Sequence, residues 1–194
     1  MGRFKMLIPF SEILLPISYS ILGGIIKFLD DVHDRNRQFS RRALLCWGLT
    51  GFTIILLDLW MYFDIFTALL TIALAMGLIL IGKVDNYQFI AIALFTLPIA
   101  VYLLYQAGCL LLIPPMLLAF TPSAVLDEVL HDRSHHFNYT AIRWLVSHRP
   151  LMKIIVLILP FFGLFTIFHA IAFWFFDITY DLVAYRLGVK LNGY

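Results

Sequence analysis

The sequence contains few charged residues and few cysteines. Asp, Glu, Lys and Arg make up 13% of its 194 residues, whereas a soluble domain carries about 25%. Basic and acidic residues nearly balance, at 14 and 12, which argues against the basic surface that a nucleic-acid partner requires. Cys46 and Cys109 lie in or beside apolar segments without CxxC spacing, which argues against a disulfide framework and a zinc site.

Hydrophobic residues are abundant instead, at 62% of the chain with a mean hydropathy of +0.91. A membrane crossing needs about 20 mostly apolar residues. The composition therefore predicts an all-α, multi-pass integral membrane protein: one helical bundle over residues 1–194 with six or seven transmembrane helices. Apolar runs place the predicted spans at 7–29, 43–63, 65–82, 88–105, 109–130 and 152–176.

Two segments outside these spans have an amphipathic pattern. The stretch "FNYTAIRWLVSHRP", residues 137–150, predicts a short interfacial helix that ends before Pro150. The tail "ITYDLVAYRLGVKLNGY", residues 178–194, is similar, and we expect it to lie along the membrane surface.

Basic residues gather after the first, third and fifth predicted spans, whereas the connections near Asp64 and Gln106 contain none. An excess of Lys and Arg marks the cytoplasmic side of a membrane. The segments after these three spans are therefore predicted to be cytoplasmic.

Two acidic motifs lie in these cytoplasmic segments: "FLDDVHDR", residues 28–35, and "VLDEVLHDR", residues 125–133. Their spans are four helices apart, so they run in the same direction and end at the same membrane face. A second pair of similar strings is "YFDIFT" (62–67) and "FFDITY" (175–180). The pattern predicts parallel internal repeats, 1–83 and 88–194.

The acidic motifs predict a magnesium site. In a helix, Asp30 and Asp34 share one face, with Asp31 beside them. Adjacent carboxylates repel unless a cation lies among them, and Mg²⁺ favours oxygen ligands shared with phosphate. The predicted ligands are Asp30, Asp31, Asp34, Asp127, Glu128 and Asp132. Among them, Asp31 and Asp127 are the candidate catalytic residues.

Arginines near the motifs are predicted to hold phosphate, because guanidinium groups bind phosphate oxygens in a bidentate manner. They are Arg35, Arg42, Arg133, Arg143 and Arg149. Two facing clusters with Mg²⁺ would neutralise a departing diphosphate. The predicted partners are an isoprenyl or other lipid diphosphate, membrane lipids, and a second copy or another membrane subunit.

The strings "DDVHDR" and "DEVLHDR" resemble the two aspartate-rich motifs, NDxxDxxxD and DxxxD, of the UbiA superfamily of intramembrane prenyltransferases. Asp30 stands at the family's Asn, Asp31 and Asp34 fall on its first two Asp, and Asp127 with Asp132 approximates its second motif. Gln38 stands where the last acid of the first motif is expected. The resemblance covers these motifs and the helix order. It implies a Mg²⁺-dependent transferase or cyclase acting on an isoprenyl diphosphate.

Two alternatives stay open. Acids and arginines at the end of a span also cap helices and mark the membrane boundary. The chain would then be a non-catalytic membrane subunit or transporter, whose paired charges lock helices together or gate a pathway. Alternatively, histidines and carboxylates would form a metal site that oxidises lipid. The additional site residues are His33, His131 and His135.

Other ionisable residues lie within the predicted spans. His169 is a functional candidate because ionisable groups at membrane depth are costly, although a hydrogen bond to a neighbouring helix also explains it. Asp58, Asp64 and Asp177 are expected near the far ends of their spans, where capping or interfacial water accounts for them.

Overall fold

The chain is all-helical in a computed structural model that describes residues 8–34, 39–82, 86–133, 136, 138–148, 150–163 and 166–187. No strand occurs in this part of the chain. The elements are α1 (Ile8–Asp34), α2 (Phe39–Phe63), α3 (Ile65–Ile81), α4 (Tyr87–Gln106), η1 (Leu110–Leu112), α5 (Ile113–Asp132), α6 (Thr140–Ser147), α7 (Pro150–Ile158), η3 (Leu159–Phe162) and α8 (Ile167–Arg186).

Five of the described helices are long and apolar enough to cross a membrane: α1, α2, α4, α5 and α8. Two shorter apolar helices, Ile65–Ile81 and Pro150–Phe162, accompany them. Large apolar side chains such as Leu44 and Leu111 cover the outside of the bundle and are 88% and 87% exposed. The predicted all-α membrane architecture is confirmed at this level.

The predicted span 152–176 is wrong as one continuous helix. The chain turns at Gly163, whose φ of 71° lies in the left-handed region, and α8 begins after its N-cap Thr166. Glycine adopts this conformation without strain and ends helices for that reason. Apolar residues on both sides of the turn conceal it in the sequence.

The predictions for the two amphipathic segments differ in how well they agree with the structure. Residues 140–147 form the short helix α6, and α7 starts at Pro150, so the predicted helix and its end are confirmed. The surface position predicted for 178–194 is wrong for its first part, because α8 continues to Arg186 and Thr179 and Tyr180 bond to α1. Residues 188–194 lie outside the described residues.

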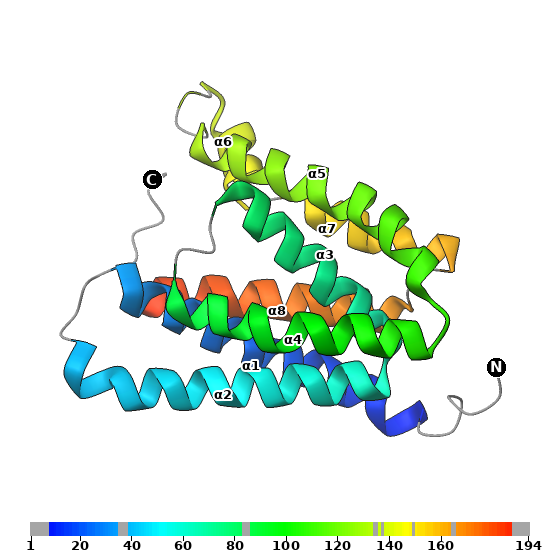
Figure 1. Cartoon of the computed structure of the whole chain (residues 1–194). Coiled ribbons are helices and arrows are strands. Elements are labelled where there is room, and N and C mark those ends of the chain that lie inside the picture. Colours follow the sequence, from blue (N-terminus) through cyan, green and yellow to red (C-terminus); the bar gives the residue numbers. More distant parts are fainter. Residues whose placement is uncertain are drawn as a thin grey trace.

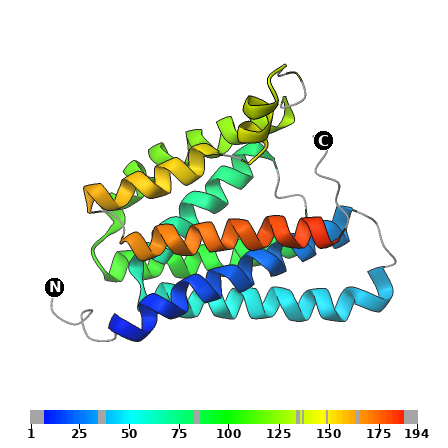
Figure 2. The same ribbon diagram turned by 180° about the vertical axis from the view of Figure 1, so that it is seen from behind.

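Successive long helices run in alternating directions. Figure 1 shows α1, α3, α5 and α8 ending on the left, where the two acidic motifs lie, and α2, α4 and α7 ending on the right. We call the left end the acidic end and the right end the opposite end. Figures 1 and 2 show α3, α5 and α7 inclined to α1, α2, α4 and α8.

Helix α3 contributes much of the core, since Ala68, Leu69 and Leu70 are almost completely buried. A smaller cluster at the acidic end joins Leu29 and Cys46. Helices α1 and α8 pack closely because Gly23 has no side chain: a Cβ there would lie 2.2 Å from the Phe176 carbonyl oxygen. Small residues allow such close contact between membrane helices.

Candidate functional site

The first acidic motif bonds to its own helix and to α8. The Lys27 ammonium lies 2.8 Å from Asp30 Oδ2, and the Tyr180 hydroxyl donates to the same oxygen over 3.1 Å. Lys27 also lies 5.1 Å from the centre of the Tyr180 ring, within cation–π range. Asp31 is buried, with 5% of its surface exposed.

The second acidic motif holds α5 to α7. Asp127 is 1% exposed. Its Oδ1 accepts from the Leu151 amide over 2.9 Å, and its Oδ2 from the Met152 amide over 2.8 Å. The first amides of a helix lack intrahelical partners, so Asp127 caps α7. Both oxygens of this predicted metal ligand thus bond to backbone.

The structure describes only part of the predicted site. His33 and His131 are partly buried near the ends of α1 and α5, Arg133 is exposed after α5, and Arg143 is partly buried on α6. The predicted residues whose side chains lie outside the described part are Asp34, Arg35, Arg42, Glu128, Asp132, His135 and Arg149.

The described contacts of the two motifs lead to different helices. Asp30 bonds to α8, whereas Asp127 bonds to α7. Among the side chains that the structure describes, no three His, Cys, Asp or Glu residues lie close enough to hold a metal ion. A shared magnesium site and a histidine–carboxylate site therefore stay predictions.

Helix α8 carries a polar contact that the sequence analysis missed. Lys153 of α7 lies 2.5 Å from Asp177 of α8. Asp177 is ten residues from the start of α8 at Ile167, so its predicted place at the end of a span is wrong. The spacing of Asp177, Tyr180 and Asp181 on one helix face could have indicated this polar side.

The acids of the two similar strings, Asp64 in residues 62–67 and Asp177 in residues 175–180, do not occupy equivalent positions in the structure. Asp64 stands between α2 and α3 as the N-cap of α3, whereas Asp177 lies inside α8. The capping role expected for Asp64 is confirmed. The internal repeat stays a prediction.

Asp64 is the centre of a hydrogen-bond network at the opposite end. Its carboxylate accepts from the Phe66 amide over 3.3 Å, and from the Thr67 amide and hydroxyl over 3.0 and 2.7 Å. The Tyr19 hydroxyl of α1 in turn donates to the Thr67 hydroxyl over 3.3 Å. The network joins α3 to α1.

His169 extends this network to α8. Its Nε2 lies 2.6 Å from Asp64 Oδ2, and its Nδ1 lies 3.3 Å from the Thr166 amide nitrogen and 2.7 Å from the Thr166 hydroxyl. Burial by itself raises the pKa of Asp64, but the hydrogen bond and electrostatic interaction with His169, together with the Thr67 and Phe66 donors, hold that pKa below its ordinary value.

An apolar segment separates the polar residues near the start of α8 from those in its second half. Ala170 and Phe173 are buried there. The Phe173, Phe176 and Tyr180 rings form a stack with successive centroid distances of 6.3 Å. Helix α8 thus has His169 near one end, Asp177 and Tyr180 toward the other, and aromatic rings between them.

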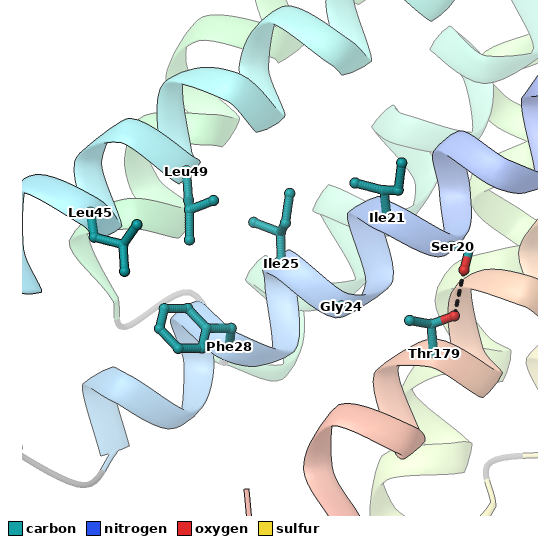
Figure 3. A pocket seen from close by; sticks show the side chains of 8 residues that line it. All are labelled: Ser20, Ile21, Gly24, Ile25, Phe28, Leu45, Leu49 and Thr179. Carbon is teal, nitrogen blue, oxygen red and sulfur yellow. Dashed lines mark hydrogen bonds between the residues drawn. The ribbon is translucent and has the colours of Figure 1, made fainter. Parts of the chain in front are cut away.

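A groove of about 490 Å³ lies between α1, α2 and α8. Figure 3 shows its walls, which are mostly aliphatic, and the contact between the Ser20 and Thr179 hydroxyls, whose oxygens are 2.6 Å apart. The lining residues are Ser20, Ile21, Gly24, Ile25, Phe28, Leu45, Leu49 and Thr179. The aliphatic walls of the groove suit a hydrocarbon chain. None of the lining residues belongs to α5, the helix that carries the second acidic motif.

No family model matches the chain, and comparisons with curated proteins and with solved structures find no match. What the chain does is therefore inferred from its own residues.

Proposed function

We propose that the chain is a non-catalytic membrane protein of the transporter class, in which paired charges along α8 gate a path for protons or other cations. One observation carries the proposal: α8 makes polar contacts with three other helices. His169 bonds to Asp64 at the start of α3, Asp177 to Lys153 of α7, and Tyr180 to Asp30 of α1.

The physical argument is the cost of ionisable groups at membrane depth. Removing charges from water is expensive, and such residues within spans mark pathways or relays. The polar groups toward each end of α8 are separated by Phe173 and Phe176. A hydrophobic barrier between two polar regions can close a pathway by excluding water.

The proposal includes seven crossings. Helix α3 has 17 residues, which corresponds to about 26 Å at 1.5 Å per residue, close to the hydrocarbon thickness of about 30 Å. Helix α7 with η3 would form the sixth crossing. The basic residues after α1, α3 and α5 favour a cytoplasmic position for the acidic end.

Reconstituted vesicles test the transport function. The full chain would be placed in vesicles that contain a pH-sensitive dye, and proton and potassium gradients would be applied separately. Asp177→Asn leaves Lys153 without its counter-ion, so we expect at least about a tenfold change in flux, equivalent to about 1.4 kcal/mol. Wild-type vesicles without flux, or an Asp177→Asn variant with unchanged flux, would contradict the proposal.

Asp58→Asn is the matched control. Asp58 is a carboxyl residue of α2, and its Oδ1 has no hydrogen-bond partner among the described residues. Its neutralisation removes one negative charge, as Asp177→Asn does, without touching α8. We expect unchanged flux.

A second candidate function is a Mg²⁺-dependent enzyme acting on an isoprenoid or other lipid diphosphate. It is favoured by the burial of Asp31 and Asp127, which are 5% and 1% exposed. They lie in the last turns of α1 and α5, and Figure 1 shows that both helices end at the acidic end. Asp31→Asn would then abolish Mg²⁺-dependent release of diphosphate from a prenyl diphosphate, and Asp58→Asn would not. Failure of the wild-type protein to bind Mg²⁺ in calorimetry would reject this function.

A further inference from the structure

We infer that His169 and Asp64 form a proton-binding site that links the protonation of the imidazole to the start of α8. This inference rests on the transport function proposed above. It adds that the proton is the ion whose binding is coupled to transport. The site lies at the opposite end of the bundle from the acidic motifs (Figure 1).

The hydrogen bonds determine which imidazole nitrogen carries hydrogen. The Thr166 amide can only donate, so Nδ1 accepts its bond over 3.3 Å, and the Thr166 hydroxyl donates to the same nitrogen over 2.7 Å. Nε2 then carries the hydrogen and donates to Asp64 Oδ2 over 2.6 Å. In this arrangement the ring is neutral, and Nδ1 is the nitrogen without hydrogen, which accepts both Thr166 bonds.

Protonation of Nδ1 would change the bonds at the start of α8. The Thr166 hydroxyl would turn and accept, but the Thr166 amide would lose its acceptor, which is one of the two bonds of the capping box. The bond from Nε2 to Asp64 would strengthen because both groups would be charged. A proton therefore loosens the first turn of α8 while tightening the contact with α3.

Thr166, whose amide and hydroxyl both contact Nδ1, is exposed, whereas His169 itself is only 7% exposed. On the inner side, the network continues through Thr67 to Tyr19, which are 0% and 5% exposed. The Tyr19 hydroxyl donates to the Thr67 hydroxyl, which donates to the Asp64 carboxylate. The site thus connects the surface to a hydrogen-bonded path toward the core.

The surroundings suit a proton better than a metal ion. The ionisable groups of this network are Asp64 from α3 and, through Thr67, Tyr19 from α1. Helix α2 contributes the Trp60 carbonyl, which accepts from the Asp64 amide. The lysine of α7, Lys153, pairs with Asp177 further along α8. Both Asp64 oxygens already accept donors, and the described residues form no group of three metal-binding side chains.

Nitrogen NMR of the full chain in bilayers, with ¹⁵N-labelled histidine, tests the site directly. His169→Gln identifies the His169 signals by their loss. We expect the Nε2–H tautomer while the ring is neutral, and faster hydrogen exchange of the Thr166 amide once Nδ1 is protonated. An Nδ1–H tautomer, or acid protonation without change at the Thr166 amide, would overturn the inference.

Flux measurements separate this site from the transport function itself. His169→Gln should remove the pH dependence of flux, and Thr166→Val should change that dependence while preserving the contact between His169 and Asp64. The matched control is His136→Gln, an exposed histidine that follows α5 at the acidic end, which should keep the wild-type pH dependence. Flux whose pH dependence survives in His169→Gln overturns the site but leaves transport intact. Absence of flux, with the expected NMR behaviour, rejects transport but supports the proton site.

Discussion

At the scale of single residues, four of the described carboxylates bond to backbone amides or to basic side chains. Asp127 and Asp64 cap α7 and α3, while Asp30 and Asp177 pair with Lys27 and Lys153. Capping and ion pairing both neutralise a group that is expensive to bury. Each bond therefore has a structural effect that can be measured apart from any transport or catalysis.

Replacing Asp127 tests its role as a cap. Asp127→Ala leaves the Leu151 and Met152 amides without their acceptor, so we expect the free energy of unfolding to fall by about 1–3 kcal/mol. Denaturation in mixed detergent micelles measures it. Asp127→Asn retains one acceptor oxygen and should lie between Asp127→Ala and the wild type. Equal stability of all three proteins would show that the cap contributes nothing.

The network around Asp64 predicts acid sensitivity. The pKa of Asp64 is lowered in the folded protein because the His169, Thr67 and Phe66 donors outweigh burial. The stability from this shift is fully present above the unfolded pKa of about 3.9 and is lost as pH falls through the lower folded value. Unfolding measured between about pH 5 and pH 2 should therefore show a steeper loss in the wild type than in Asp64→Asn. Parallel curves would contradict this prediction.

At the scale of helices, the contact between α1 and α8 depends on a missing side chain. Gly23→Ala would place a Cβ 2.2 Å from the Phe176 carbonyl oxygen, so the helices must move apart. Overpacking of this kind costs about 1–3 kcal/mol, and we expect that loss in micelle unfolding. The control Gly48→Ala meets no atom within 4 Å and should not destabilise the protein, because alanine favours a helix interior over glycine by up to about 1 kcal/mol. Similar values for the two variants would refute the close contact.

At the scale of helices, apolar composition also does not determine where one helix ends and the next begins. Residues on both sides of Gly163 are apolar, so the sequence predicted a single helix over 152–176 where α7, η3 and α8 occur. The left-handed conformation of Gly163 allows the reversal. Composition indicates that a segment suits a membrane, but it does not show that α7 ends at Ile158 or that η3 ends at Gly163.

At the scale of the whole molecule, the seven crossings proposed above predict the side on which each end lies. Single cysteines would be introduced at Ala107, Thr166 or Arg133 after replacing Cys46 and Cys109 with Ala. Ala107 follows α4, Thr166 precedes α8 and Arg133 follows α5. Figure 1 shows that α4 ends and α8 begins at the opposite end, whereas α5 ends at the acidic end. An impermeant thiol reagent should label the first two from one side of the membrane and Arg133→Cys only from the other. Labelling of all three from one side would exclude a crossing by α7 and η3.

The sequence by itself determined that the described chain is helical and apolar enough for a membrane, because in hydrocarbon a helix satisfies the backbone amides and carbonyls of its own segment. It also placed most helices within a few residues and marked Asp30, Asp31 and Asp127 as unusual. Only the tertiary structure decided the partners of these groups. Asp64 and His169 are 105 residues apart in the chain, and Asp177 meets a lysine on another helix. The local sequence pattern shows that a residue is polar. The packing of the helices determines which partner offsets the cost of burying it.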